Sequence, residues 1–120
     1  MVDSYRGLKV WQSAMDLAAE CYEITRPFPR EELFGLTSQI RRASSSVAAN
    51  IAEGYGRDSK GDFVRFLRIA QGSLKETETH LLLAQRVGLL AGDVLERLLV
   101  RSDETGRMLR ALYRRVEGER

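Results

Sequence analysis

The chain contains only two prolines, Pro27 and Pro29, and both lie in one short segment. Each proline removes a backbone donor and forces the residue before it out of the helical region, so a helix must end there. Every residue after Pro29 can therefore lie in long helices that no proline interrupts. This distribution disfavours a β-rich fold and predicts an all-α one.

Apolar residues recur at alternating spacings of three and four in four segments, which is the spacing of one face of an amphipathic helix. The predicted buried faces are Val10, Ala14, Leu17, Cys21 and Ile24 in the first segment; Leu36, Ile40, Ala43, Val47 and Ile51 in the second; Phe63, Leu67, Ala70, Leu74, Thr77, Leu81 and Ala84 in the third; and Leu95, Leu98, Leu99, Thr105, Met108, Leu109, Leu112 and Val116 in the fourth. Helices joined by short connections pack antiparallel to their neighbours. The sequence therefore predicts an up-down-up-down four-helix bundle, and the period of about 3.5 residues favours left-handed crossing of its helices.

The residues between these segments predict where the helices begin and end. The second helix is expected to begin near Glu31 or Glu32, because acidic residues suit a helix N-terminus. The third is expected to run from about Lys60 to Gly88, a glycine that can adopt a left-handed cap. Asp93 is the expected N-cap of the fourth helix.

With 120 residues, of which 43% are hydrophobic and 30% charged, the chain has the size and composition of one folded domain over residues 1–120. Its single cysteine, Cys21, lies on the apolar face of the first helix, where a small buried hydrophobe belongs. The first residues do not resemble a signal peptide, and no segment approaches the roughly 18 apolar residues of a membrane span. We therefore expect a soluble cytoplasmic protein, and its formal charge of +2 gives no strong overall basic field.

Few residues suggest catalysis or metal binding. His80 is the one histidine and follows Glu76 by one helical turn, whereas a two-metal carboxylate bundle needs two Glu-x-x-His motifs. The serines at 44–46 lie within a predicted helix without a Gly-x-Ser-x-Gly motif, and residues 54–57 match no phosphate-binding loop. We therefore expect no enzymatic activity, no metal and no cofactor. An enzyme that uses Glu53, Glu76 and His80 is the least favoured alternative.

Polar residues stand in the apolar register of the second helix. Asn50 follows Val47 in the buried series, and Glu53 comes about one turn later. Buried amides and carboxylates are tolerated only when they are hydrogen-bonded. We therefore predict a polar layer between the second and third helices that fixes register or subunit pairing, with a ligand-binding or catalytic role as the alternative. Its predicted members are Arg42, Asn50, Glu53, Ser73 and Glu76.

Basic residues gather locally, and three arginines of the last helix form a stripe through their three-four spacing. Interspersed Asp58, Asp62, Asp103 and Glu104 weaken the field, so a solvated helix face is the simpler interpretation. Oligomerisation would concentrate these arginines and strengthen binding to phosphate backbones. The candidate nucleic-acid-binding residues are Arg41, Arg57, Lys60, Arg65, Arg68, Arg107, Arg110 and Arg114.

Distinctive motifs occur along most of the chain. They are Leu8-Lys9-Val10-Trp11 with Ala14; Phe28-Pro29 with Glu32; Phe34-Gly35-Leu36-Thr37-Ser38-Gln39; Arg41-Arg42-Ala43; Asn50-Ile51-Ala52-Glu53-Gly54-Tyr55-Gly56; and Phe63, Phe66-Leu67, Ala70, Gly72-Ser73-Leu74 and Glu76. Over roughly residues 5 to 116, the chain resembles the four-helix-bundle family that includes the 23S rRNA intervening-sequence proteins. It departs from the family at Ser46-Val47-Ala48-Ala49, where Ser-Ile-Pro is more frequent.

The resemblance implies a bundle that assembles as a ring-shaped homopentamer and has no established enzymatic activity. Family members are encoded within intervening sequences of ribosomal RNA genes or as free-standing genes, and related accessory proteins of diversity-generating retroelements bind nucleic acid and a reverse transcriptase. We therefore expect a non-enzymatic homopentamer whose basic surface contacts RNA or a nucleoprotein, without a membrane. The alternative is a protein–protein adaptor or accessory subunit that makes no nucleic-acid contact and displays exposed aromatic residues such as Tyr5, Trp11 and Tyr55.

Overall fold

The computed structural model describes residues 4–118, which form four α-helices and two short 3-10 helices. In chain order these are η1 (Tyr5–Gly7), α1 (Lys9–Thr25), η2 (Arg30–Glu32), α2 (Leu36–Tyr55), α3 (Lys60–Arg86) and α4 (Gly92–Gly118). No strand occurs within the described range, so the prediction of an all-α chain with four helices is confirmed. The single domain predicted over residues 1–120 also includes residues 1–3 and 119–120, which lie outside that range.

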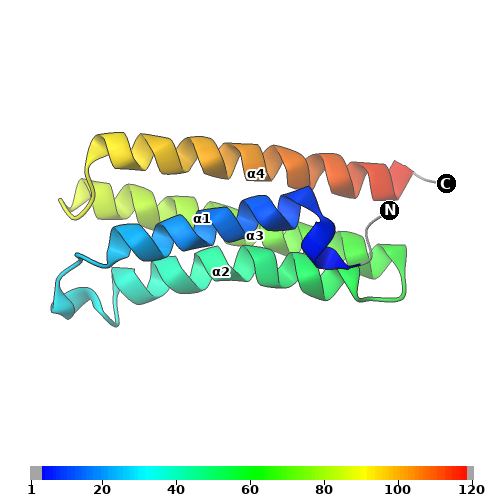
Figure 1. Ribbon diagram of the computed structural model, residues 1–120, viewed down its shortest axis with the longest axis horizontal. Coiled ribbons are helices and arrows are strands. Elements are labelled where there is room, and N and C mark those ends of the chain that lie inside the picture. Colours follow the sequence, from blue (N-terminus) through cyan, green and yellow to red (C-terminus); the bar gives the residue numbers. More distant parts are fainter. Residues whose placement is uncertain (1–3, 119–120) are drawn as a thin grey trace.

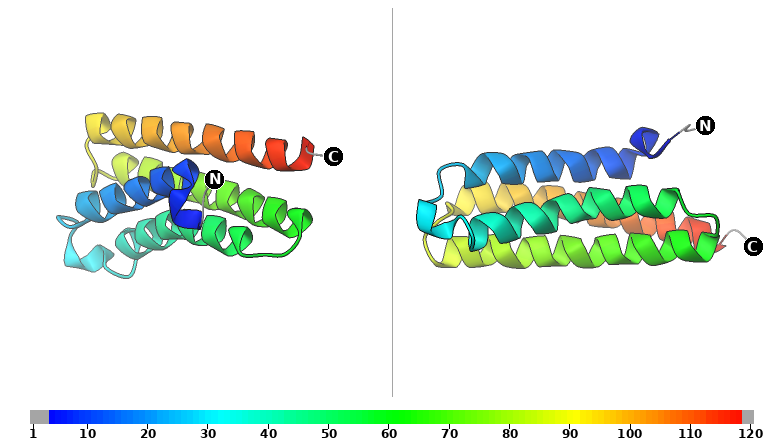
Figure 2. Two further views of the ribbon diagram at one scale, coloured as in Figure 1. Left: turned by 45° about the vertical axis from the view of Figure 1, so that its right-hand side comes forward. Right: turned by 90° about the horizontal axis from the view of Figure 1, so that it is seen from below.

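The four α-helices lie side by side along the long axis of a molecule that measures 49 × 23 × 20 Å (Figure 1). Helices that follow one another in the chain pack together, and α1 also packs against α4, which closes the set. The α1–α2 and α3–α4 connections, residues 26–35 and 87–91, lie at one end, which we call the loop end (Figure 1). The α2–α3 connection, residues 56–59, lies at the opposite end, which we call the hairpin end, and both views in Figure 2 agree.

The core lies between the four helices and contains most of the predicted apolar positions. Large side chains with no exposed area come from each helix, among them Leu17 of α1, Ile40 of α2, Leu74 of α3 and Leu109 of α4. In α1, Thr25 is buried while the predicted Ile24 is half-buried. Within the part of the chain that the structure describes, no helix is long and apolar enough to cross a membrane.

The predicted start of the second helix is wrong by about one turn. Residues Arg30–Glu32 form a separate 3-10 turn, and α2 begins only at Leu36. The Glu32 carboxylate oxygen Oε1 accepts a hydrogen bond of 3.0 Å from the Leu36 backbone N–H. Glu32 therefore stabilises the N-terminus of α2 from outside the helix, which is the role that acidic residues take near a helix start.

The prediction for the end of α3 is confirmed, whereas the prediction for the start of α4 is not. Gly88 has a φ of +86°, its N–H bonds to the Gln85 carbonyl at 3.1 Å, and the Leu89 N–H bonds to the Ala84 carbonyl at 2.8 Å. These two bonds form the left-handed glycine cap expected there. The expected N-cap of α4 is wrong, because α4 begins at Gly92 and Asp93 lies in its first turn.

Helices α2 and α3 approach each other closely at Gly54, near the hairpin end. A Cβ atom at Gly54 would lie 2.7 Å from the Phe66 Cβ and 3.2 Å from the Phe63 Cδ1. The shorter distance is less than two carbon atoms can tolerate, so only glycine permits the two helices to pack this closely. Gly54 therefore determines where the α2–α3 connection lies relative to the core.

We predict that Gly54→Ala lowers the free energy of unfolding by about 1 to 3 kcal/mol, because the added methyl group must push α3 away. The matched control is Gly72→Ala in α3, where the new Cβ meets nothing within 4 Å. That change should raise the stability by about 0.5 to 1 kcal/mol through helix propensity. Urea unfolding at one fixed protein concentration measures both, and equal effects of the two changes would contradict the prediction.

Candidate nucleic-acid interface

The structure brings most of the predicted basic residues into one half of the molecule. Arg57, Lys60, Arg65 and Arg68 lie at or near the hairpin end, and residues 107–114 lie in the part of α4 that runs toward the same end (Figure 1). Arg41 does not join them, because it lies near the start of α2 at the loop end. We call the hairpin-end residues, without Arg41, the basic half.

Three arginines of the basic half lie over aromatic rings. The guanidinium carbons of Arg57 and Arg65 lie 4.8 and 4.5 Å from the centroid of the Phe66 ring. The guanidinium of Arg68 lies 4.6 Å from the centroid of the Tyr113 ring, which joins α3 to α4. Stacking holds a guanidinium plane in place while its N–H edges stay available to an acceptor.

Acidic neighbours partly neutralise these stacked arginines. Arg57 pairs with Glu53 at 2.7 Å, and Arg68 pairs with Glu117 at 3.1 Å. Arg65 lies 3.8 Å from an Asp62 oxygen. All of these side chains are about half-exposed, so each pair contributes little to stability and can exchange its acid for another anion.

The arginine stripe of α4, which consists of Arg107, Arg110 and Arg114, is less fully paired with acidic side chains. Arg107 pairs with Asp103 at 3.0 Å. Arg110 and Arg114 are exposed, and neither forms an ion pair within residues 4–118. These two arginines are therefore the cations of the stripe whose charge no neighbour offsets.

Arg41 has a structural environment. Its Nε donates a hydrogen bond of 2.9 Å to the Thr25 Oγ1, and its guanidinium lies 4.6 Å from the Tyr22 ring centroid. Both partners belong to α1, so Arg41 connects α1 to α2 and is half-buried. A nucleic-acid contact at Arg41 stays a prediction.

The predicted polar layer corresponds to two sets of contacts between α2 and α3. In the first, Arg42 pairs with Glu76 at 3.1 Å, and the His80 Nε2 lies 3.5 Å from the same Glu76 oxygen. In the second, the hydroxyls of Ser46 and Ser73 are hydrogen-bonded at 2.9 Å. These contacts connect α2 to α3, but the Arg42 and Glu76 side chains are 62% and 41% exposed, so this pair is not part of a buried layer.

Asn50 and Glu53 take different places relative to this layer. The Asn50 Nδ2 donates to the Ser46 carbonyl at 2.8 Å and to the Ser46 Oγ at 3.0 Å, so Asn50 reaches α3 only through Ser46. Glu53 pairs instead with Arg57, which lies in the α2–α3 connection. Ser46 was missed, although its position four residues before Asn50 on the same helical face could have indicated it. Whether the layer has more than a structural role stays a prediction.

The serine hydroxyls and His80 were weighed above as candidates for catalysis or metal binding, and their contacts are structural. Ser44 and Ser45 donate to backbone carbonyls three residues earlier in α2. Among residues 4–118, no group of three or more His, Cys, Asp or Glu side chains could hold a metal ion. His80 has one carboxylate neighbour, Glu76, which already pairs with Arg42.

Cys21 is fully buried in the core, as its place in the apolar series predicted. Desolvation by burial raises the pKa of its thiol to about 12, although a hydrogen bond with Ser44 acts in the opposite direction. A thiolate is the nucleophilic form of cysteine, and here it is strongly disfavoured. Cys21 therefore behaves as a small core hydrophobe.

The aromatic residues expected to form an exposed adaptor surface do not form one. Tyr5 and Trp11 are half-buried and pack edge to face at 5.3 Å between ring centroids. Tyr55 is half-buried and packs in the same way against Phe63 at 5.9 Å. That choice of residues is wrong, because each ring is half-buried by packing against a neighbouring ring.

Comparison with known proteins defines the family. The family model described as 23S rRNA-intervening sequence protein matches residues 6–111. The chain belongs to this family. A solved structure from Bacteroides thetaiotaomicron, a protein of unknown function from the S23 ribosomal protein family, is 26% identical to this chain and superposes on it with a TM-score of 0.82. The match covers 88% of this chain and 96% of that one, and no curated protein matches significantly.

The motifs that carry the resemblance have physical roles in this chain. The glycine of the Asn50-to-Gly54 run permits the close approach of α2 to α3, and its asparagine binds Ser46. Gly35 of the Phe-Gly-Leu motif precedes α2, and a Cβ there would lie 2.8 Å from the Glu32 Oε1 that caps Leu36. Both glycines therefore stand where a side chain would disturb a specific contact.

We predict that Cys21 of the folded protein reacts with a thiol reagent at pH 8 at least about a hundredfold more slowly than in urea. Its folded pKa of about 12 lies above the ordinary value of 9.0, so the unfolded chain loses the proton first. The contribution of the neutral Cys21 thiol to the free energy of unfolding is therefore complete below pH 9, and it falls as the pH rises from 9 toward 12. Equal reaction rates in native buffer and in urea would contradict the burial of Cys21.

Proposed function

We propose that this chain is a non-enzymatic cytoplasmic protein that binds RNA, alone or within a nucleoprotein, through its basic half. In this proposal each chain is a left-handed up-down-up-down bundle, and five chains assemble as a ring-shaped homopentamer. The observation that carries the RNA proposal is the gathering of Arg57, Arg65, Arg68, Arg110 and Arg114 at one end, with three of them stacked on aromatic rings. The name of the family supports RNA as the nucleic acid.

The chemistry of these side chains suits a phosphate backbone. A guanidinium presents a planar fork of N–H donors that matches phosphate oxygens two at a time. A phosphate can bind Arg110 and Arg114 without displacing a carboxylate. At Arg57 and Arg68 it must first replace a half-exposed carboxylate. Such contacts read charge and backbone shape and carry little sequence information.

Assembly into a homopentamer would supply the positive electrostatic field that a single chain lacks. The formal charge of the monomer is only +2, which is too small to attract RNA strongly at physiological salt. A closed ring repeats the basic half once per subunit, so phosphates would meet several copies of the same surface. Repeated weak contacts on one rigid body raise the overall affinity far above that of a single contact.

We predict that RNA binding weakens steeply with salt and depends on the unpaired arginines of α4. The test variant is Arg110→Glu with Arg114→Glu, and a labelled RNA hairpin is titrated by fluorescence anisotropy at several salt concentrations. Its affinity should fall at least about tenfold at 0.1 M salt, with a shallower dependence of log K on log salt concentration, because phosphate contacts are lost.

The control for this titration changes the net charge equally elsewhere. Lys75→Glu with Arg86→Glu reverses two exposed charges of α3 that lie outside the basic half. Its affinity should stay within about threefold of the unaltered protein, because local contacts dominate over net charge at this salt. Affinity that ignores salt, or equal losses in both variants, would overturn the proposed RNA surface.

We predict a mass about five times the chain mass of 13.6 kDa in light scattering after size-exclusion chromatography. A ring closed by five identical contacts should keep this mass on dilution until the subunits dissociate, without growing into longer species at high concentration. A monomeric or dimeric mass would overturn the pentamer and leave the RNA titration to be judged by itself.

A protein adaptor without nucleic-acid contact is the second candidate. The observation that favours it is a group of exposed apolar side chains near the C-terminal end of α3, with Leu82 48%, Leu83 45% and Val87 58% exposed. Exposed apolar patches mark protein interaction sites. Recovery of one defined protein partner that persists after nuclease treatment and is lost with Leu83→Ser would favour this candidate.

A further inference from the structure

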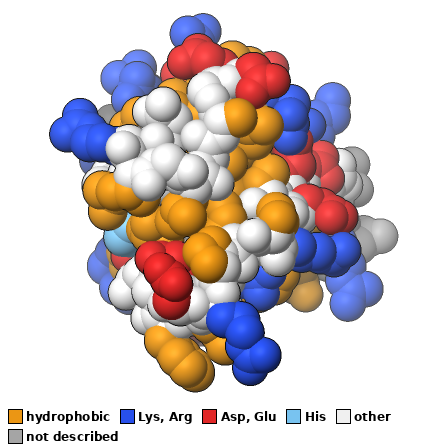
Figure 3. All heavy atoms as spheres, turned by 90° about the vertical axis from the view of Figure 1, so that its left-hand side faces the viewer, with side chains coloured by type: hydrophobic (Ala, Val, Ile, Leu, Met, Phe, Trp, Pro, Cys, Tyr) orange, Lys and Arg blue, Asp and Glu red, His pale blue; other side chains and the backbone are white. Residues whose placement is uncertain are grey.

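An open pocket of about 280 Å³ lies at the loop end, where the end of α1 meets the start of α2. Figure 3 views this end of the molecule, and several Lys and Arg side chains lie at its lower right. Arg26, Arg30 and Arg41 line the pocket, and none of the residues that line it is acidic. The pocket is therefore a concave surface with positively charged walls.

The Arg41 guanidinium is held in a fixed position by α1. Its Nε donates to the Thr25 Oγ1 at 2.9 Å, its Nη2 donates to the Tyr22 carbonyl oxygen at 3.5 Å, and it lies over the Tyr22 ring. Within residues 4–118 the Arg41 side chain forms no ion pair, and its Nη1 forms no hydrogen bond. A positioned cation with unused N–H donors therefore lies in the wall of the pocket.

Thr37, in the first turn of α2, carries a hydroxyl that lacks a partner. The residue is only 5% exposed, and its hydroxyl forms no hydrogen bond within the described part of the chain. Its Oγ1 is not among the fully enclosed polar atoms without a partner, so it is open to the pocket that Thr37 lines. Buried hydroxyls are usually hydrogen-bonded, and an oxygen atom of a ligand in this pocket would supply the missing acceptor.

The other two arginines lie at the opening of the pocket. Arg30 is exposed and forms no ion pair within residues 4–118. Arg26 pairs with Glu23 at 3.4 Å, but the two side chains are 69% and 62% exposed. Such an exposed pair contributes little to stability, so Arg26 can turn toward a stronger anion.

The acidic residues of the α1–α2 connection do not neutralise the pocket. The Glu32 carboxylate binds the Leu36 N–H at the start of α2, and Glu31 is exposed. Neither residue lines the pocket. A simpler interpretation is that the arginines only stabilise the C-terminal end of α1. That role accounts for Arg41, which contacts α1, but not for the unpaired Arg30 or for the open hydroxyl of Thr37.

We propose that this pocket binds a phosphate group. The Thr37 hydroxyl and the Arg41 Nη1 donate to phosphate oxygens inside the pocket, and Arg30 and Arg26 close over the group from the opening. A tetrahedral phosphate accepts hydrogen bonds from several directions, and guanidinium groups match its oxygens two at a time. The pocket is large enough for a phosphate group and part of its substituent, but it is too small for a nucleic-acid helix.

The site is separate from the proposed RNA surface. The loop end and the hairpin end are opposite ends of a bundle that is 49 Å long, so one phosphate group cannot contact both sets of arginines (Figure 1). The phosphate belongs either to a small phosphomonoester or to the backbone of an RNA. Both present the same oxygen atoms, and experiment distinguishes them.

The first experiment titrates inorganic phosphate at constant ionic strength and follows its ³¹P NMR signal. Arg30→Gln should weaken phosphate binding at least about tenfold through the loss of a charge-assisted contact, and Thr37→Val about threefold or more through the loss of a hydrogen bond. Neither change should lower the helix content or the melting temperature, because Arg30 is exposed and the Thr37 hydroxyl has no partner in the chain.

The matched control is Arg110→Gln, which removes another exposed and unpaired arginine at the hairpin end. Its phosphate affinity should stay within about twofold of that of the unaltered protein, because charges further apart than the Debye length are largely screened. No phosphate binding by the unaltered protein, or equal losses in the Arg30 and Arg110 variants, would overturn the site. A melting temperature that falls in Thr37→Val without loss of phosphate binding would assign the hydroxyl a purely structural role and also overturn it.

The second experiment identifies the source of the phosphate. Uridine monophosphate and the labelled RNA hairpin are each titrated into the unaltered protein and the Arg30→Gln variant. A phosphomonoester site loses affinity for uridine monophosphate in the variant and keeps its affinity for the hairpin, whereas an RNA-backbone site loses affinity for the hairpin. Both patterns support the pocket, and unchanged affinity for both probes would contradict it. The Arg110 and Arg114 variants test the proposed RNA surface separately, since neither residue lines this pocket.

Discussion

The close packing of α2 on α3 is the contact on which the other features depend. At Gly54 the two helices approach within a distance that excludes any side chain, and this approach positions Phe63 and Phe66 on α3. Phe66 then provides the ring over which Arg57 of the α2–α3 connection and Arg65 of α3 lie. A residue that carries no side chain therefore controls where the cations of the hairpin end lie, and a shift of α3 would move packing and charge together.

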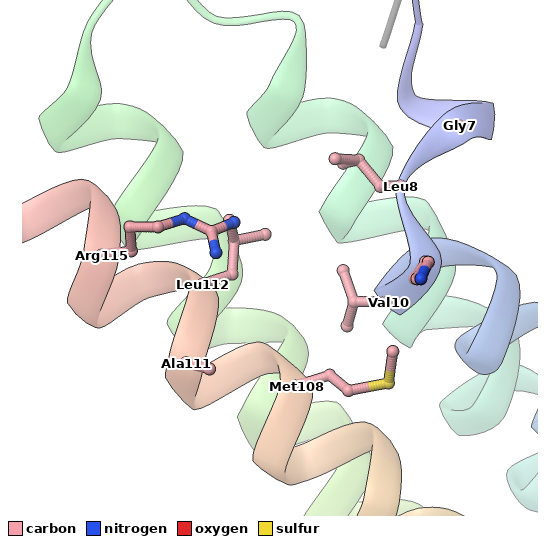
Figure 4. Close-up of a pocket in the computed structure, with 8 residues that line it drawn as sticks. Gly7, Leu8, Val10, Met108, Ala111, Leu112 and Arg115 are labelled. Carbon is pink, nitrogen blue, oxygen red and sulfur yellow. The ribbon is translucent and has the colours of Figure 1, made fainter. Parts of the chain in front are cut away.

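The unequal lengths of the helices produce the remaining asymmetry of the molecule. α3 and α4 have 27 residues each, whereas α1 has 17, so the core of the hairpin end lacks the full cover of a fourth helix. The short segment before α1 supplies Leu8, and the edge-to-face pair of Tyr5 and Trp11 packs nearby in the sequence. An apolar groove remains between the start of α1 and the last turns of α4, where Leu8, Val10 and Met108 line it (Figure 4).

The periodicity of the sequence was enough to predict the core but not the surface. Leu67, Leu74 and Leu81 are buried because helical geometry alone places every third or fourth residue on one face. The start of α2 was missed because Glu32 caps the helix from outside it, which spacing does not encode. Phe34 was missed for a related reason: residue type predicts burial, and only the ordered turn around it leaves the ring exposed. Ion pairs such as Arg68–Glu117 join residues far apart in the chain and depend on how α3 packs on α4, so the sequence pattern could not predict them.

Most of the stacked arginines at the hairpin end have an acidic neighbour. Glu53, Asp62 and Glu117 each lie beside a stacked arginine, so a single chain has guanidinium groups in fixed positions but little net field. An exposed ion pair contributes little to the free energy of folding, so a phosphate can replace the carboxylate with little loss of stability. Binding of RNA at these positions, as proposed above, would need a long-range attraction that one chain lacks. Several copies in one assembly would supply it by bringing together the Arg110 and Arg114 side chains of each copy.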